Sequence, residues 1–100
     1  MERLFLVERH KGPDWDHSRP RREQLGWPEH AAFMDGLAEA GFVVLGGPVG
    51  EGDGDEALLV IEADSESEVR SRLGDDPWPE SQLTVERIRP WNVLLRAPGP

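Results

Sequence analysis

Hydrophobic residues gather in four short runs that predict β-strands. Two of the runs are apolar at every position, Leu4-Phe5-Leu6-Val7 and Ala57-Leu58-Leu59-Val60-Ile61, as is typical of strands that are buried on both faces. A third strand is predicted over residues 42–45, ended by Gly46-Gly47-Pro48, and a fourth over residues 83–95.

Two helices are predicted between these strands. Pro28 suits the first helical position, apolar residues recur at helical spacing after it, and Gly41 suits the C-terminal cap. The sequence Ser65-Glu66-Ser67-Glu68 is a capping-box pattern that opens a second helix, which Gly74 ends. The predicted inward positions of the two helices include Phe33, Met34, Leu37, Val69 and Leu73.

The order of these elements, β–α–β–β–α–β, predicts an α+β fold of the ferredoxin-like kind with a four-stranded antiparallel sheet. The usual strand order of that fold, 4-1-3-2, places the two fully apolar runs at the centre. Because proline cannot donate a ladder hydrogen bond, Pro90 predicts that the last strand lies at an edge or is bulged. We expect one domain over residues 1–100, with a frayed tail over residues 95–100.

Two helices can cover only one face of such a sheet. The other face would expose Leu, Val and Ile side chains over a larger patch than monomers tolerate. We therefore predict a homodimer that stacks sheet on sheet about a two-fold axis and so forms a dimeric α+β barrel.

Composition narrows the classes of partner. The formal net charge of −9 over 100 residues repels phosphate backbones, so we expect no nucleic-acid partner. The chain has no cysteine, which excludes disulfides, thiolate nucleophiles and cysteine-ligated metals. No apolar run approaches the roughly 20 residues that span a membrane. No signal-peptide pattern follows Met1, so a cytoplasmic location without a membrane partner is expected.

The candidate acid–base pair is His30 and Asp76. His30 lies on the inward stripe in the first turn of the predicted helix, where the helix dipole disfavours a protonated ring. Asp76 follows the second helix, in Asp75-Asp76-Pro77-Trp78. A carboxylate bonded to one ring nitrogen would fix the tautomer and leave the other nitrogen as a base. An inward histidine also fits a purely structural role, and Asp76 fits an ordinary helix stop.

Further candidates would form the walls of a ligand pocket. The bend at Gly46-Gly47-Pro48 either only turns the chain or lets a ligand approach the backbone closely. The indoles of Trp15, Trp27 and Trp78 suit stacking on a flat ligand. The segment Asp14-Trp15-Asp16-His17 matches no established metal-site spacing. We therefore expect neither a metal nor another cofactor.

Four motifs occur in order along the chain: Trp27-x-x-His30-x-x-Phe33-Met34-x-x-Leu37-x-x-x-Gly41-Phe42, Gly46-Gly47-Pro48, Asp76-Pro77-Trp78 and Pro90-Trp91. The set resembles the YCII-like (YciI-related) domain family. This resemblance implies a ferredoxin-like dimer with a pocket between helix and sheet, where His30 and Asp76 form the active site and the Pro48 turn lines it. A few relatives look like dehydrochlorinases of chlorinated hydroxyquinols. The connection over residues 11–27 is longer than the family pattern, which leaves the substrate open.

Two functions remain open from the residues and the resemblance. The first is an enzyme without metal or cofactor, in which His30 acts as general base or acid and Asp76 orients it. Its substrate would be a small organic compound, flat if the tryptophans contact it, that undergoes elimination, isomerisation or tautomerisation. The second is a non-catalytic module that binds a small ligand or a partner with the same barrel. A cofactor-free oxygenase rests on fold analogy alone.

Overall fold

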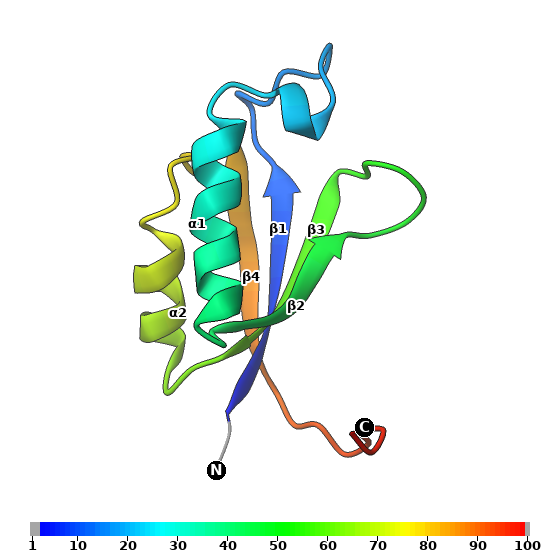
Figure 1. Ribbon diagram of the computed structural model, residues 1–100, viewed down its shortest axis with the longest axis vertical. Helices are drawn as coiled ribbons and strands as arrows, with labels where there is room; N and C mark the ends of the chain where they lie inside the picture. The colour runs from blue at the N-terminus through cyan, green and yellow to red at the C-terminus, as the bar shows by residue number, and fades with distance from the viewer. Residues whose placement is uncertain (1–2, 100) are drawn as a thin grey trace.

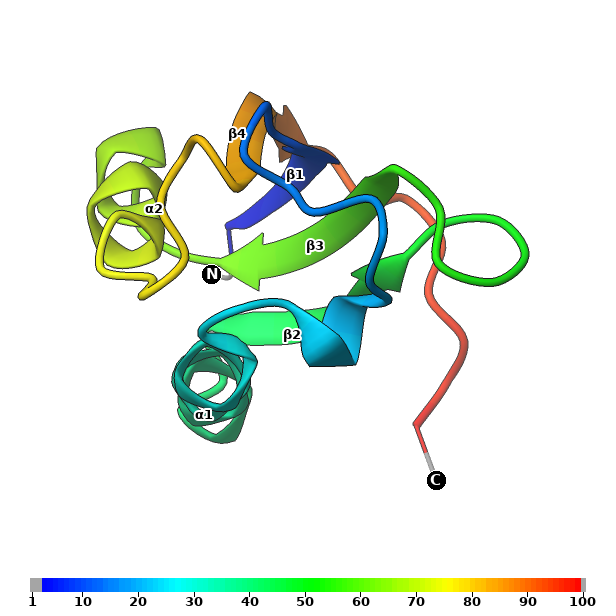
Figure 2. The same ribbon diagram turned by 90° about the horizontal axis from the view of Figure 1, so that it is seen from above.

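The chain folds into one antiparallel sheet with both helices on the same side of it (Figure 1, Figure 2). The computed structural model describes residues 3–99; residues 1, 2 and 100 of the predicted domain lie outside the described residues. In chain order the elements are β1 (Leu4–Lys11), the 3-10 turn η1 (Arg21–Glu23), α1 (Trp27–Glu39), β2 (Val43–Pro48), β3 (Glu56–Glu62), α2 (Glu66–Leu73) and β4 (Leu83–Trp91).

The strand order is β2-β3-β1-β4, which confirms the predicted ferredoxin-like arrangement. The two fully apolar runs lie in β1 and β3 at the centre of the sheet, paired antiparallel from Leu4 opposite Glu62 to His10 opposite Glu56. Strand β4, which contains Pro90, is an edge strand as predicted. Its ladder with β1 is irregular between Val85 and Arg87 rather than at the proline.

The core lies between the helices and one face of the sheet. Because side chains alternate along a strand, every second residue of β1 and β3 reaches this core. The helices begin and end close to where capping residues predict: the Ser65 hydroxyl accepts from the Glu68 N–H, and Gly41 has a φ of 79° just after α1. The buried side chains that pack together are Phe5, Val7, Leu37, Phe42, Val43, Leu59, Ile61, Ala63, Val69, Leu73 and Ile88.

Two strands differ in length from the prediction. Strand β2 continues through the predicted bend, and Pro48 lies opposite Ala57 at its end. The proline is tolerated there because β2 is an edge strand. Strand β4 ends at Trp91, four residues before the predicted end, because Trp91 lies opposite Leu4, where β1 begins. Residues 92–99 have no regular secondary structure.

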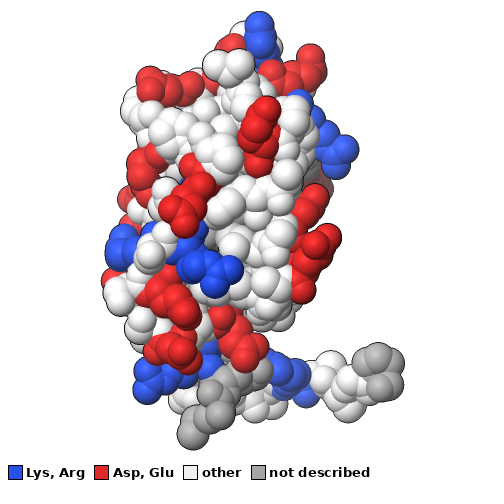
Figure 3. Space-filling view, turned by 60° about the vertical axis from the view of Figure 1, so that its left-hand side comes forward, with Lys and Arg blue, Asp and Glu red and all other residues white. Residues whose placement is uncertain are grey.

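The surface over the helices carries many acidic side chains with a few basic ones between them (Figure 3), in keeping with the net charge of −9. Arginine side chains that line a cavity, described below, therefore differ in charge from most of the charged side chains on this surface. Neither of the helices in residues 3–99 has the length and apolar character needed to cross a membrane.

Candidate active site

His30 and Asp76 lie 46 residues apart in the chain and are directly hydrogen-bonded. The His30 Nδ1 atom is 2.8 Å from Asp76 Oδ1 and 3.0 Å from Asp76 Oδ2. His30 projects from the first turn of α1, and Asp76 follows α2 after Gly74. Both residues are buried, with 6% and 9% of their surface exposed. The fold therefore brings the two predicted residues together away from bulk water.

The Asp76 carboxylate has two further donors. The backbone N–H of Trp78 donates to Oδ1 at 2.9 Å, and Arg9 Nη1 donates to Oδ2 at 2.9 Å. Burial alone would raise the pKa of Asp76, but the hydrogen bonds from His30, Trp78 and Arg9 outweigh it and hold that pKa below its usual value. An ionised Asp76 accepts a hydrogen bond from His30 Nδ1–H. This selects the tautomer in which the His30 Nε2 lone pair is free to accept a proton.

The imidazole ring is also fixed by stacking. The rings of His30 and Trp78 lie 3.8 Å apart between centroids and are inclined by 9°. The Trp78 indole N–H donates to the Leu25 carbonyl at 2.8 Å, which holds the indole in place. Trp15 and Trp27 pack against Trp78, with centroids 5.3 Å and 5.8 Å away. These aromatic contacts leave His30 little freedom to rotate.

Arg9 is a site residue that the sequence analysis did not single out. It is 2% exposed, and besides Asp76 it donates from Nη2 to the Leu83 carbonyl at 2.9 Å. The sequence of β1 does indicate that Arg9 is buried, because Phe5 and Val7 face the core. The same alternation places Arg9 on the buried face, and a buried arginine needs a carboxylate partner.

A cavity of about 210 Å³ lies beside His30. Of the predicted pocket residues, Trp27, Gly47 and Pro48 line it. Trp15 and Trp78 do not line it, because Trp78 stacks on the His30 ring and Trp15 packs against Trp78. Apolar walls around a histidine make electrostatic interactions inside the cavity stronger than in water. The full lining is Arg9, Arg21, Trp27, His30, Met34, Gly46, Gly47, Pro48, Ala57, Leu59 and Leu83.

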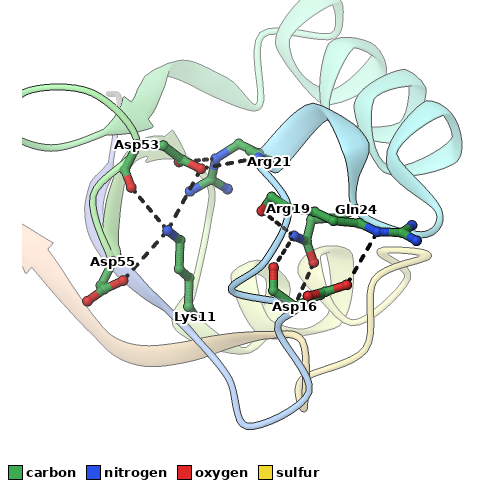
Figure 4. Close-up of polar contacts among 7 residues, drawn as sticks. All are labelled: Lys11, Asp16, Arg19, Arg21, Gln24, Asp53 and Asp55. Carbon is green, nitrogen blue, oxygen red and sulfur yellow. Dashed lines mark hydrogen bonds and ion pairs between the residues drawn. The ribbon is translucent and has the colours of Figure 1, made fainter.

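The long connection between β1 and α1 forms part of this cavity wall, because Arg21 belongs to it. Figure 4 shows how it is held. The buried Gln24 side chain donates to the carbonyls of Asp16 and Arg19 at 2.7 Å and 2.9 Å. Arg21 Nε donates to Asp53 Oδ1 at 2.9 Å, which ties the connection to the β2–β3 hairpin. The hairpin and the connection therefore meet at the cavity.

A family model for the YCII-related domain matches residues 4–92. The chain belongs to the YCII-related domain family. A search of curated proteins gave no match.

One solved structure similar to this YCII-related domain is the 5-chloro-2-hydroxyhydroquinone dehydrochlorinase TftG from Burkholderia phenoliruptrix AC1100, in complex with 2,5-dihydroxybenzoquinone. The two chains are 26% identical, with a TM-score of 0.59. The similarity covers 89% of this chain and 93% of the other.

The segment Asp14-Trp15-Asp16-His17 contains side chains that could ligate a metal, but its Asp16 carboxylate makes contacts within the chain. The Asp16 carboxylate accepts from the Ser18 backbone N–H and hydroxyl and pairs with Arg19 at 3.4 Å. His10, which precedes this segment in the chain, pairs with Glu56 at 3.3 Å. Within residues 3–99, no three His, Asp or Glu side chains gather as a metal site would require.

Replacing Gly46 with alanine is expected to destabilise the YCII-related domain by about 1–3 kcal/mol. An added Cβ would overlap the buried Leu59 side chain and lie 3.1 Å from the Leu58 carbonyl oxygen. Gly47 is the matched control, since a Cβ there meets nothing within 4 Å. Urea denaturation of both variants checks this; equal stabilities of Gly46→Ala and Gly47→Ala would contradict it.

Proposed function

We propose that this YCII-related domain is a small enzyme that transfers a proton between His30 and a small organic substrate bound in the cavity, without a cofactor. The observation that carries the proposal is the direct hydrogen bond between His30 Nδ1 and Asp76 beside a cavity that His30 itself lines. Among the described residues, His30 Nε2 has no hydrogen-bond partner, so it is available to a ligand.

The proposed chemistry follows from the two ring nitrogens. Nε2 accepts a proton from the substrate, and the ionised Asp76 stabilises the imidazolium that forms. In an elimination, the electron pair of the broken bond to hydrogen forms the new double bond, and the leaving group departs with its own bonding pair. In an isomerisation, Nε2 returns the proton to a different atom. Both reactions need only a base that is held in one tautomer.

The dehydrochlorinase neighbour favours elimination among these reactions. Its name assigns it the loss of chloride from a chlorinated ring, and it was solved with a small flat ring compound. The cavity here has flat and apolar walls from Trp27, Met34 and Leu83, which suit a ligand of that shape. The substrate that we propose is a small ring compound able to lose a proton.

A ligand screen distinguishes this enzyme from a binding module with the same fold. Wild type and His30→Gln are mixed with small ring compounds, including 5-chloro-2-hydroxyhydroquinone and 2,5-dihydroxybenzoquinone. The unfolding temperature and the compounds recovered are both measured. Conversion by wild type but not by His30→Gln supports the enzyme. A compound that stabilises both proteins equally and is recovered unchanged supports the binding module.

We also propose that two copies of the chain pair through the sheet face that the helices leave uncovered. Leu6, Val60 and Leu45 lie side by side across three strands on that face, and Leu45 is 65% exposed. A second copy would bury Leu45 and the exposed part of Leu6, in the manner expected of a two-fold interface, whereas Val60 between them is already buried in the single chain.

Replacing Leu45 with lysine is expected to shift the protein from twice the mass of the chain toward the mass of one chain, because a charge would be buried at the interface. Leu25→Lys is the control, since Leu25 is 87% exposed in the β1–α1 connection, off the sheet. Sedimentation equilibrium measures both masses. A wild-type protein of single-chain mass would rule out the dimer.

A further inference from the structure

The charges that line the cavity have one sign. The chain has 20 Asp and Glu residues against 11 Lys and Arg residues. Yet among the described residues that line the cavity, Arg9 and Arg21 are the sole members of these four types. Their partners, Asp76 and Asp53, lie outside the lining. The cavity of an acidic protein is therefore faced by two cations.

Each of these two guanidinium groups has an N–H that the fold leaves unused. Arg9 Nε and Arg21 Nη2 are shielded from solvent and have no hydrogen-bond partner among the described residues. A buried donor without a partner costs free energy, and most buried polar groups have one. Neither nitrogen belongs to the bonds with Asp76, Leu83 or Asp53 described above. Both arginines therefore retain capacity for a further acceptor.

The two arginines approach the cavity from different elements and are held differently. Arg9 comes from β1 and is fixed by Asp76 and Leu83. Arg21 comes from η1, its side chain is 14% exposed, and its hydrogen bonds among the described residues go to Asp53. These bonds hold both guanidinium groups at the cavity wall, so each places a fixed positive charge there.

We propose that the cavity selects an anionic ligand: a flat organic compound that carries a carboxylate or an ionised phenol. The guanidinium groups of Arg9 and Arg21 bind the anionic oxygen, and the apolar part of the ligand contacts Trp27 and Met34. This specificity rests on the proposed function, because it defines the substrate class of the same cavity. A charge-assisted hydrogen bond is roughly twice as strong as a neutral one.

The same two charges assist the proposed proton transfer. When His30 takes a proton from the substrate, negative charge grows on the substrate. Fixed cations beside that charge stabilise the transition state without having to reorganise. Arg21 thereby acts as a binding residue for the anion, and its contribution is measurable without any turnover.

The test compares two ligands of the same shape, benzoate and benzamide, at neutral pH. Trp27 lines the cavity, so quenching of tryptophan fluorescence reports binding. Benzoate is expected to bind wild type at least about tenfold more tightly than benzamide. Equal affinities, or tighter binding of benzamide, would overturn the proposal, and this comparison needs no variant to fold.

Variants of Arg21 and Arg22 then show which side chain causes the preference for benzoate over benzamide. Arg21→Gln is expected to lose most of the preference for benzoate, and Arg21→Lys to recover part of it because the charge returns. Arg22→Gln is the matched control, since Arg22 is the next residue, is exposed and does not line the cavity. It should keep the full preference. The same loss in Arg21→Gln and Arg22→Gln would contradict an anion site at Arg21.

Failure of this specificity and failure of the proposed function give different results. Equal binding of benzoate and benzamide, together with substrate conversion that needs His30, removes the anion site and leaves the enzyme. A preference for benzoate that depends on Arg21, together with no conversion of any ring compound, leaves the anion site and removes the enzyme.

Discussion

Replacing His30 with glutamine is expected to lower the rate of proton transfer by about 10²- to 10⁴-fold, the usual contribution of a positioned general base. A glutamine amide can still donate to the Asp76 carboxylate, so the buried acid keeps a partner. It has no nitrogen lone pair that accepts a proton at neutral pH. The loss is therefore expected in kcat rather than in ligand affinity.

Chloride release from 5-chloro-2-hydroxyhydroquinone, or conversion of a compound found in the ligand screen, measures the rate. His10→Gln is the matched control, because His10 pairs with Glu56 and does not line the cavity. It should retain the wild-type rate. A folded His30→Gln protein with unchanged kcat/KM would show that the imidazole is not the base.

Most of the fold follows from local signals in the sequence. The apolar runs of β1 and β3 identify the two central strands, where residues of both side-chain alternations are buried: Leu4, Phe5, Val7, Leu59, Val60 and Ile61. Ser65 and Gly41 mark helix boundaries through their own backbone preferences. Strand β2 was harder to delimit, since Pro48 suggests a bend but is compatible with the end of an edge strand.

The candidate site was only partly accessible from the sequence. The inward position of His30 follows from helical spacing. The direction in which the Asp76 side chain points does not follow from the sequence of the turn that contains it. That direction depends on Arg9, which lies 67 residues earlier, and on the Trp78 N–H. Such contacts between distant residues leave no local pattern. The position of Arg21 at the cavity was not predicted for the same reason, because it depends on Asp53 in a different loop.

The second large effect is expected in stability. Asp76→Asn should lower the free energy of unfolding at neutral pH by about 3–5 kcal/mol, the usual cost of removing one partner of a buried ion pair. The Arg9 guanidinium would remain buried, 2% exposed, without a compensating charge. Asp75→Asn is the matched control, since Asp75 is adjacent and exposed, and should change stability by less than about 0.5 kcal/mol.

The stability difference between wild type and Asp76→Asn should also depend on pH. The folded state holds the pKa of Asp76 below its usual value through the hydrogen bonds from His30, Trp78 and Arg9, despite the opposing effect of burial. A group with a lowered pKa contributes its stability above the pKa of the unfolded chain. That contribution is lost as the pH falls through the lower pKa of the folded state.

Acidification should therefore reduce the difference in free energy of unfolding between wild type and Asp76→Asn. The reduction should begin near the ordinary pKa of aspartate, about 3.9. Urea denaturation followed by tryptophan fluorescence, at one protein concentration and at pH values from neutral to about 3, measures this difference. Asp75→Asn should follow wild type over the whole range, because Asp75 is not part of the buried ion pair. A difference that stays constant on acidification would mean that the Asp76 carboxylate contributes no ionisation-dependent stability. The ion pair that orients His30 in the proposed mechanism would then have to be reassigned.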